Sequence, residues 1–360
     1  MPINFKPNFT NTPRIIHNLL RIQAVKHTIL HLPLTPAVLR SLRETARLYT
    51  THYSTMIEGN KLDLAQIANV LKNDSHFPGR QRDEYEVKSY YVALTQVEQW
   101  VAAKVTITEK MIRQLHALVM SHGKINNTPT EYRDAQNVIR DSSTGSIVYM
   151  PPQAQDVPEL MQAMVQWLRN EHEHSCPIVA AIIHYQFATI HPYFDGNGRT
   201  ARLLTTLILH LGGYDLKGLY SLEEYYAQNL PAYYEAISIG TSHNYYMGRA
   251  EADITKWIEY FIEGMAVSFE NVSKRMQKEQ HRPDASELLK TLEPRQRKTL
   301  ELFIDSFVIT SSQVGHLFGF QPRTASKLCA DWVKDGFLEI VNPSNKARTY
   351  KLGKNYTKLV

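Results

Sequence analysis

The segment His191–Arg202 (HPYFDGNGRTAR) gathers the residues of this chain whose types and spacing best suit chemistry. It links two apolar helical stretches, so Gly196 and Gly198 lie just before a predicted helix over 200–210. The free backbone N–H groups at a helix N-terminus bind anions, and glycines let the anion approach closely. Arg199 and Arg202 are three residues apart and share one face of the first turns. Two arginines beside an anion pocket indicate a polyphosphate.

Two further side chains of this segment fit phosphoryl or nucleotidyl transfer. Asp195 adjoins the predicted phosphate pocket, and Mg²⁺ in such sites prefers one or two carboxylates together with phosphate oxygens and water. His191 enters from the other side of the loop, where an imidazole can act as a general base. A Walker P-loop does not explain the segment, because the Gly-x4-Gly-Lys-Ser/Thr pattern is missing from the sequence. A Rossmann fingerprint fails as well, because the preceding stretch is helical.

Each part of the segment has an ordinary explanation when it is taken alone. Gly-Asn-Gly is usually a turn, and a lone histidine at a helix end is usually structural. The complete pattern His-x3-Asp-Gly-Asn-Gly-Arg-x2-Arg is much rarer, and it resembles the signature of the Fic (Fic/Doc) family, His-x-Phe-x-Asp/Glu-Gly-Asn-Gly-Arg-x2-Arg. Tyr193 replaces the usual Phe, which is a packing residue in that family. The surrounding helices and a predicted hairpin extend the resemblance over residues 40–270.

The resemblance implies a mainly α fold, a Fic helical core with a small β-hairpin flap, and a protein adenylyltransferase. Such an enzyme transfers AMP from ATP to a Ser, Thr or Tyr hydroxyl of a protein, itself included, and releases pyrophosphate. The implied catalytic residues are His191 as base, Asp195 as the Mg²⁺ ligand, Asn197 in the anion hole, and Arg199 and Arg202 on the β- and γ-phosphates. The implied nucleotide-binding residues are Glu58, Gly196, Asn197, Gly198, Arg199, Thr200, Ala201, Arg202 and Tyr234.

A second motif, Ser54-Thr-Met-Ile-Glu58-Gly59-Asn60, precedes the core. Alone it is an ordinary amphipathic helix with an exposed glutamate. Beside the first motif it resembles the Fic inhibitory motif, Ser/Thr-x3-Glu-Gly/Asn, in which the glutamate pairs with the second arginine, here Arg202. The resemblance therefore implies inhibition in cis by an N-terminal helix, with Ser54, Glu58 and Gly59 as inhibitory residues.

Two more features have both a functional and a structural interpretation. The segments 136–139 and 146–149 predict a β-hairpin around the polar turn 141–145. In the family such a flap aligns the main chain of the target by strand addition, with Val138, Ile139 and Val148 as candidates here; a plain packed hairpin is the alternative. Tyr233 and Tyr234 fall where the family lines its adenine pocket. We favour Tyr234 as the nucleotide contact, and a core position is equally compatible with two tyrosines on a helix.

The C-terminal part predicts a separate winged helix-turn-helix. Residues 285–360 hold 12 basic and 7 acidic residues, which accounts for the whole net charge of +5. The predicted organisation is a helical region 1–104 with the inhibitory motif, a Fic core 105–275, a linker 276–286 and a winged helix 287–360. Nucleic-acid binding through basic residues of the last helix and wing is one interpretation. Protein interaction or homodimerisation is favoured, because acidic residues interrupt the basic face. The basic residues are Arg323, Lys327, Lys334, Lys346, Arg348 and Lys351.

The composition restricts the class of protein further. The chain has 360 residues, 43% of them hydrophobic and 21% charged, which is typical of a globular protein. Its two cysteines, Cys176 and Cys329, exclude a disulfide framework and a four-cysteine zinc site. The sequence contains no run of about 20 apolar residues, the length that a membrane-spanning helix needs. We therefore expect a cytoplasmic protein. Two rival functions stay open: a transferase of another nucleotide or a de-AMPylase at the same site, and a DNA-binding regulator that only senses ATP. His191 argues against the second, since a sensor needs no general base.

Overall fold

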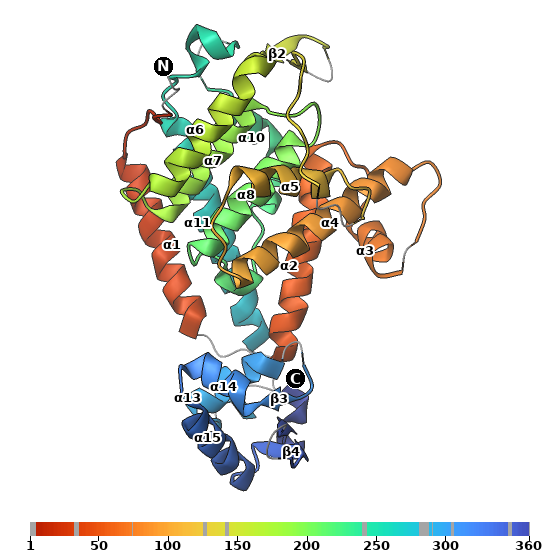
Figure 1. The fold of residues 1–360 in the computed structure, drawn as a ribbon, viewed down its shortest axis with the longest axis vertical. Helices are drawn as coiled ribbons and strands as arrows, with labels where there is room; N and C mark the ends of the chain where they lie inside the picture. Colours follow the sequence, from red (N-terminus) through yellow and green to blue (C-terminus); the bar gives the residue numbers. More distant parts are fainter. Residues whose placement is uncertain are drawn as a thin grey trace. The chain divides into compact units, whose positions relative to one another are not determined.

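The computed structural model describes residues 5–31, 36–73, 75–124, 128–140, 144–239, 243–280, 288–289, 291–303, 306–344 and 348–359. The described chain is mainly helical, with small antiparallel sheets (Figure 1). It divides into two compact units. Unit 1 comprises Met1–His27 and Ala46–Asn271, and unit 2 comprises Thr28–Thr45 and Val272–Val360. This grouping differs from the boundaries expected after residues 104 and 275.

Unit 1 is built around α7 (Cys176–Ile190), which is buried on nearly all sides. A helix that is apolar all round belongs in the centre of a core. Helix α8 (Asn197–Leu211) packs along α7, and α4, α5 and α6 pack against this pair (Figure 1). The loop between α7 and α8 is the His191–Arg202 segment, so the best-packed helices of the unit hold it at both ends. The other helices are α1 (Pro13–His31), α2 (Pro36–Ile57), α3 (Leu64–Asn73), α4 (Gln81–Ala102), α5 (Glu109–Val119), α6 (Val157–Asn170), α9 (Leu222–Gln228), α10 (Leu230–Ile237) and α11 (Thr255–Gln280).

The predicted hairpin is present but short. Strand β1 (Ile139–Arg140) pairs antiparallel with β2 (Ile147–Tyr149), and Ile139 lies opposite Tyr149. The turn residues 141–143 lie outside the described part of the chain. The Tyr149 hydroxyl donates to the Thr189 carbonyl oxygen at 2.8 Å. This buried hydrogen bond fixes the end of β2 to the last turn of α7, next to the motif loop.

Unit 2 contains, in chain order, a helix, a strand, two helices and two strands, where the sequence predicted three helices followed by a two-stranded wing. Its elements are α13 (Pro294–Thr299), β3 (Ile309–Thr310), α14 (Ser311–Phe318), α15 (Pro322–Lys334), β4 (Leu338–Asn342) and β5 (Thr349–Leu352). The strands form one sheet in the order β3-β5-β4. Trp332 and Phe337 are buried in a core of its own. The sequence predicted only the two-stranded wing, because β3 has two residues and carries no alternation pattern.

Three other segments differ from the sequence-based expectation. Residues 225–239 form two helices, because Asn229 leaves the helical conformation (φ −143°, ψ 72°) and caps α10 with its side chain. Helix α11 continues to Gln280, so the expected linker 276–286 begins inside a helix, and its residues 281–286 lie outside the described part. Helix α1 lies in the helical region expected over residues 1–104, but it was not singled out as an element. Short 3-10 or π turns occupy Ala154–Asp156, Leu216–Gly218, Tyr245–Arg249, Leu300–Phe303 and Lys354–Leu359.

Candidate active site

The end of α7 places His191 at the mouth of the motif loop. His191 takes a left-handed conformation (φ 50°, ψ 61°) as the C-cap residue, and its N–H donates to the Phe187 carbonyl oxygen at 3.0 Å. Burial lowers the pKa of His191 to about 4, against the opposing pull of Glu58 and Asp195. The imidazole is therefore neutral near pH 7, which is the form that can accept a proton.

A buried arginine that the sequence reasoning missed fixes this turn. The Nε of Arg133 donates to the His191 carbonyl oxygen at 2.9 Å, and its backbone N–H donates to the Pro192 carbonyl oxygen at 3.0 Å. The same guanidinium also donates to the carbonyl oxygens of Ala135 and Pro152. Arg133 thus joins the motif loop to both ends of the flap. A lone arginine ahead of the predicted hairpin gives no signal in the sequence that distinguishes it from a surface residue.

The N-terminus of α8 begins at Asn197, three residues earlier than expected. The Asn197 side chain accepts from the Tyr193 N–H at 3.0 Å and donates to the Tyr193 carbonyl oxygen at 2.8 Å. Gly196 is the left-handed N-cap residue (φ 77°), and the Thr200 hydroxyl donates to its carbonyl oxygen at 2.8 Å. The Asn197 side chain therefore shapes the loop, and the free N–H groups of the first helical turn are left for an anion.

Asp195 faces solvent at the edge of this loop. Its side chain is 59% exposed and lies 3.2 Å from the Arg199 Nη2. Its carbonyl oxygen is held by the Nε2 of His116 at 2.8 Å, and the His116 ring stacks on Tyr193 at 3.5 Å. Burial lowers the pKa of His116 to about 4, so we infer that the neutral ring donates here from Nε2. His116 is a second supporting residue that the sequence did not reveal.

The carboxylate of Asp195 suits only one kind of metal site. Within the described residues, no group of three or more His, Cys, Asp or Glu side chains could hold a metal ion by itself. A single exposed carboxylate beside a polyphosphate pocket agrees with Mg²⁺, which completes its shell with phosphate oxygens and water. The residues present therefore fit Mg²⁺ brought in with a nucleotide.

Arg202 is buried in the second turn of α8 and is bound by the predicted inhibitory motif. Its Nε donates to the Ser54 hydroxyl at 2.8 Å, and its Nη2 donates to the Ser54 carbonyl oxygen and to the Glu58 carboxylate, each at 2.8 Å. The side chain of Arg202 is 1% exposed and that of Glu58 is 32% exposed. Burial opposes the charge of Arg202, but Glu58 keeps the pKa of the guanidinium above its usual value. The structure thus contains the ion pair predicted from the sequence.

Glu58 also lies against the backbone of the anion pocket. A Cβ atom added to Gly198 would overlap the Glu58 carboxylate and lie 3.2 Å from the Arg202 Nη1. The carboxylate therefore approaches α8 where only a glycine leaves room. Gly59 then reverses the chain in the left-handed region (φ 92°), a conformation that favours glycine.

The two candidate tyrosines have different environments. Tyr233 is buried and stacks on Tyr226 with ring centroids 4.7 Å apart. Tyr234 is 46% exposed, and its hydroxyl donates to the Ile57 carbonyl oxygen at 3.2 Å. Of the two tyrosines, Tyr234 is thus the exposed one, and its hydroxyl contacts the last residue of the inhibitory helix.

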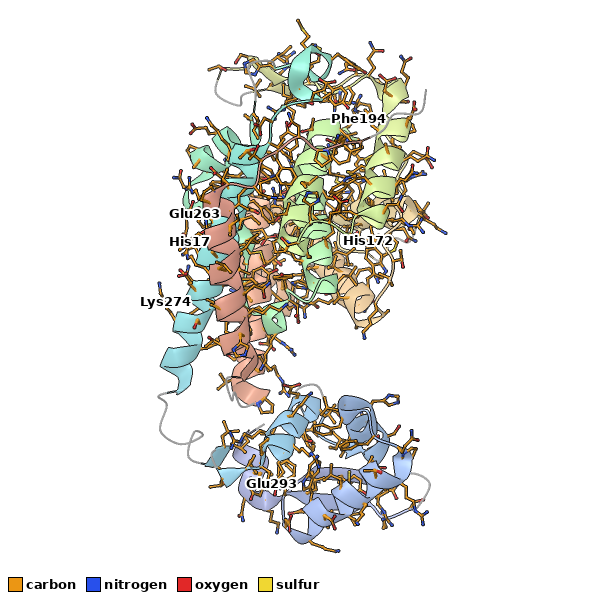
Figure 2. The ribbon with its side chains drawn as sticks, turned by 90° about the vertical axis from the view of Figure 1, so that its left-hand side faces the viewer. His17, His172, Phe194, Glu263, Lys274 and Glu293 are labelled. Carbon is orange, nitrogen blue, oxygen red and sulfur yellow. The ribbon has the colours of Figure 1, made fainter. Side chains whose placement is uncertain are left out.

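Exposed apolar side chains occur on the flap and on the motif loop. Ile147 and Val148 of β2 are exposed, and Val138 and Ile139 are half-buried. Phe194, inside the motif loop, is 60% exposed (Figure 2). These residues could contact an extended segment of another protein.

Solved structures of other proteins can be superposed on this one, and the similarity identifies its fold. A Fic family protein from Desulfovibrio desulfuricans superposes with a TM-score of 0.62 at 24% identity, covering 97% of this chain and 99% of that chain. Residues 134–508 of Fic-1 from C. elegans superpose with a TM-score of 0.56 at 24% identity, covering 74% of this chain and 73% of that chain. The fold of this protein is therefore that of Fic proteins.

Sequence comparison finds a similarity to the same family over part of the chain. Residues 106–209 match the model of the Fic/DOC family. "Protein adenylyltransferase Fic" of Drosophila erecta is 34% identical over 182 residues, 49% of this chain and 35% of the relative. The Drosophila melanogaster protein of the same name is 33% identical over 180 residues, again 49% of this chain and 35% of the relative. This chain thus contains a Fic/DOC family domain, and its match spans about a third of the length of these relatives.

Proposed function

We propose that this protein is an adenylyltransferase that transfers AMP from ATP to a Ser, Thr or Tyr hydroxyl of a protein. The observation that supports this most is the anion pocket at the N-terminus of α8, where Gly198 and Arg202 already hold a carboxylate. A neutral His191 at the entrance of the same loop supplies the base. The names of the Drosophila relatives agree with this reaction.

In this proposal each residue of the loop has one task. His191 takes the proton of the attacking hydroxyl. The hydroxyl oxygen forms a bond to the α-phosphorus, the bond between the α-phosphorus and its bridging oxygen breaks, and pyrophosphate leaves. Arg199 and Arg202 hold the β- and γ-phosphates, and the N–H groups at the start of α8 bind phosphate oxygens. Positioning and charge neutralisation then provide most of the rate enhancement.

Asp195 would hold Mg²⁺ together with the phosphates. When bound, the ion neutralises phosphate charge and supports the departure of pyrophosphate. Asp195 is suited to this task because its carboxylate is exposed at the rim of the pocket. Tyr234 would line the adenine side, where its ring is accessible.

Glu58 would keep the enzyme inactive at rest. Its carboxylate occupies Arg202 and the space above Gly198, so the γ-phosphate and Glu58 compete for the same groups. ATP that binds beside Glu58 would have its α-phosphate misaligned for attack. Ser54 supports this state because it binds the same guanidinium with its hydroxyl and its carbonyl oxygen.

The experiment uses the Glu58→Gly protein, Mg²⁺, labelled ATP and a cell lysate, with peptide mass spectrometry as the readout. We expect a mass increase of one AMP on a hydroxyl side chain of the protein itself or of a target. The matched control is Glu58→Gly with His191→Ala, which should bind ATP and label nothing. Labelling with the triphosphate of another base alone, or removal of AMP from a modified protein, would instead support the rival activities.

We further propose that unit 2 contacts protein partners, including a second copy of this chain, in preference to nucleic acid. Two of its basic side chains are partly neutralised, since Lys334 lies 3.5 Å from Asp331 and Lys351 lies 3.2 Å from Glu339. A shift of a labelled DNA duplex by the protein would contradict this preference. We place the reaction in the cytoplasm, where ATP is available and where free cysteines such as Cys176 and Cys329 are usual. Among the described residues, no helix is long and apolar enough to cross a membrane.

A further inference from the structure

The surroundings of Arg199 contain an acidic residue outside both motifs. The Arg199 side chain is buried in the first turn of α8. Its Nη2 lies 3.2 Å from Asp195, and its Nη1 lies 3.9 Å from the carboxylate of Glu86 on α4. Its Nε is buried and has no hydrogen-bond partner among the residues described. The guanidinium is thus flanked by two carboxylates, and its buried Nε–H has no partner among the residues described.

The two carboxylates differ in what else they can do. The Asp195 side chain is 59% exposed and stands where a metal ion would bind with the phosphates. The Glu86 side chain is 10% exposed and its carboxylate faces the Arg199 Nη1. When Asp195 binds a cation, its charge is shared, and Glu86 becomes the anion that continues to hold Arg199.

Glu86 is itself held in one orientation. Its Oε1 accepts from the Arg82 Nε at 3.0 Å, and its Oε2 accepts from the Asn60 Nδ2 at 3.2 Å. The Asn60 amide is fixed in turn, because it also donates to the Asp83 carbonyl oxygen at 2.9 Å and accepts from the Leu62 N–H at 3.1 Å. Glu86 therefore meets only donors in these contacts, and a carboxylate satisfies all of them.

We propose that Glu86 is a positioning residue for Arg199. It lies beside Nη1, the guanidinium nitrogen that does not contact Asp195, and so orients Arg199 for the phosphates of the nucleotide. Asn60 follows the inhibitory Glu58 by two residues, so the inhibitory segment is linked to both motif arginines. It binds Arg202 directly and Arg199 through Asn60 and Glu86. This inference rests on the proposed ATP site and adds a residue to it.

The test compares the binding of ATP with that of AMP, because AMP lacks the β- and γ-phosphates that Arg199 is assigned to hold. The measurements are calorimetric titrations with Mg²⁺ in the Glu58→Gly background. The Glu86→Gln change keeps the size of the side chain, but its NH2 group must face Arg82, Asn60 or Arg199, all of them donors. Loss of one charge-assisted contact should raise the Kd for ATP about 10-fold and leave the Kd for AMP unchanged.

Glu84→Gln is the matched control on the same helix. Glu84 is also a buried carboxylate, but its partners are His76 and the Phe77 N–H, away from the motif loop. This change should lower the melting temperature without altering the ratio of the two Kd values. If Glu86→Gln fails to fold, Glu86→Asp keeps the charge and withdraws the carboxylate by one methylene, and it should raise the same ratio.

A double-mutant cycle with Arg199→Ala decides the assignment. The effect of Glu86→Gln on ATP should disappear when Arg199 is absent. The inference is overturned if Glu86→Gln raises the Kd for AMP as much as the Kd for ATP, if it lowers the Kd for ATP, or if its effect on the Kd for ATP is the same with and without Arg199. The proposed function fails separately: in that case the Glu58→Gly protein does not bind ATP, or binds it and labels no hydroxyl.

Discussion

Replacing Glu58 by glycine should activate this protein, and the structure indicates by how much. The change removes the carboxylate from the Arg202 Nη2, 2.8 Å away, and empties the space above Gly198. Arg202 keeps its two hydrogen bonds to Ser54, so the guanidinium stays near its present place. The γ-phosphate can then take the position that Glu58 vacates.

The magnitude follows from the burial of the pair. Arg202 is 1% exposed, but Glu58 is 32% exposed, so solvent screens part of the attraction. A charge-assisted hydrogen bond in this setting contributes about 1–3 kcal/mol. Since about 1.36 kcal/mol corresponds to a factor of ten in rate, activation should be about 5- to 150-fold. It should be larger if release of Glu58 also realigns the α-phosphate.

The assay is the initial rate of AMP incorporation at saturating and at subsaturating ATP. Glu58→Gln is the control of equal size. If the charge of Glu58 dominates inhibition, the rate of this variant approaches that of Glu58→Gly. If the space that the side chain occupies dominates, its rate stays near that of the wild type. Arg202→Ala should not activate, because it also removes a phosphate ligand. Equal rates for Glu58→Gly and wild type on every protein, itself included, at saturating ATP would refute the reasoning.

Four further predictions concern the motif loop and the buried His184 of α7. His191→Ala should lower AMP transfer about 10²- to 10⁴-fold while the Kd for ATP, measured by titration, stays nearly unchanged. Because burial lowers the pKa of His191 to about 4, kcat/KM should show no inflection near pH 6.5 and should fall only as the pH approaches 4. Burial lowers the pKa of His184 to about 3 in the folded protein, whereas the unfolded chain binds a proton at this histidine near pH 6.5. The free energy of unfolding, measured in urea, should therefore fall as the pH drops below about 6.5. Asp195→Ala should weaken Mg²⁺-dependent ATP binding. If the wild-type protein still transfers AMP in excess EDTA, Asp195 is a structural residue and not a metal ligand.

The sequence predicted the functional groups that lie close together along the chain. The loop from His191 to Arg202 can be recognised because its donors, charges and glycines lie within a dozen residues. The start of α5 was also predictable, because Thr108 accepts from the Met111 N–H as an N-cap residue. Helix α1 left a signal that was overlooked: Ile15, Ile22 and Ile29 are buried at intervals of seven residues.

The supporting contacts could not be predicted from spacing. Glu58 and Arg202 are 144 residues apart, and their contact was expected only because of the resemblance to a family. Arg133, His116 and Glu86 have no such precedent in the sequence. Each acts through a backbone carbonyl or a carboxylate that tertiary packing alone brings near, so periodicity and propensity contain no information about them. A local pattern identifies groups that act together in sequence, and the residues that orient those groups become visible only in three dimensions.

The position of Glu58 explains why one pocket can serve both rest and catalysis. The N-terminal turn of α8, Gly198 and Arg202 form a site for an anion, and Glu58, in the turn that follows α2, supplies that anion. A carboxylate accepts the same hydrogen bonds as a phosphate oxygen, with less charge and a fixed tether. Gly198 admits either group but not both, because each needs the space that a side chain would fill. In the proposed function, inhibition therefore needs no separate regulatory site, because the same glycine and arginine bind either the carboxylate or the phosphate.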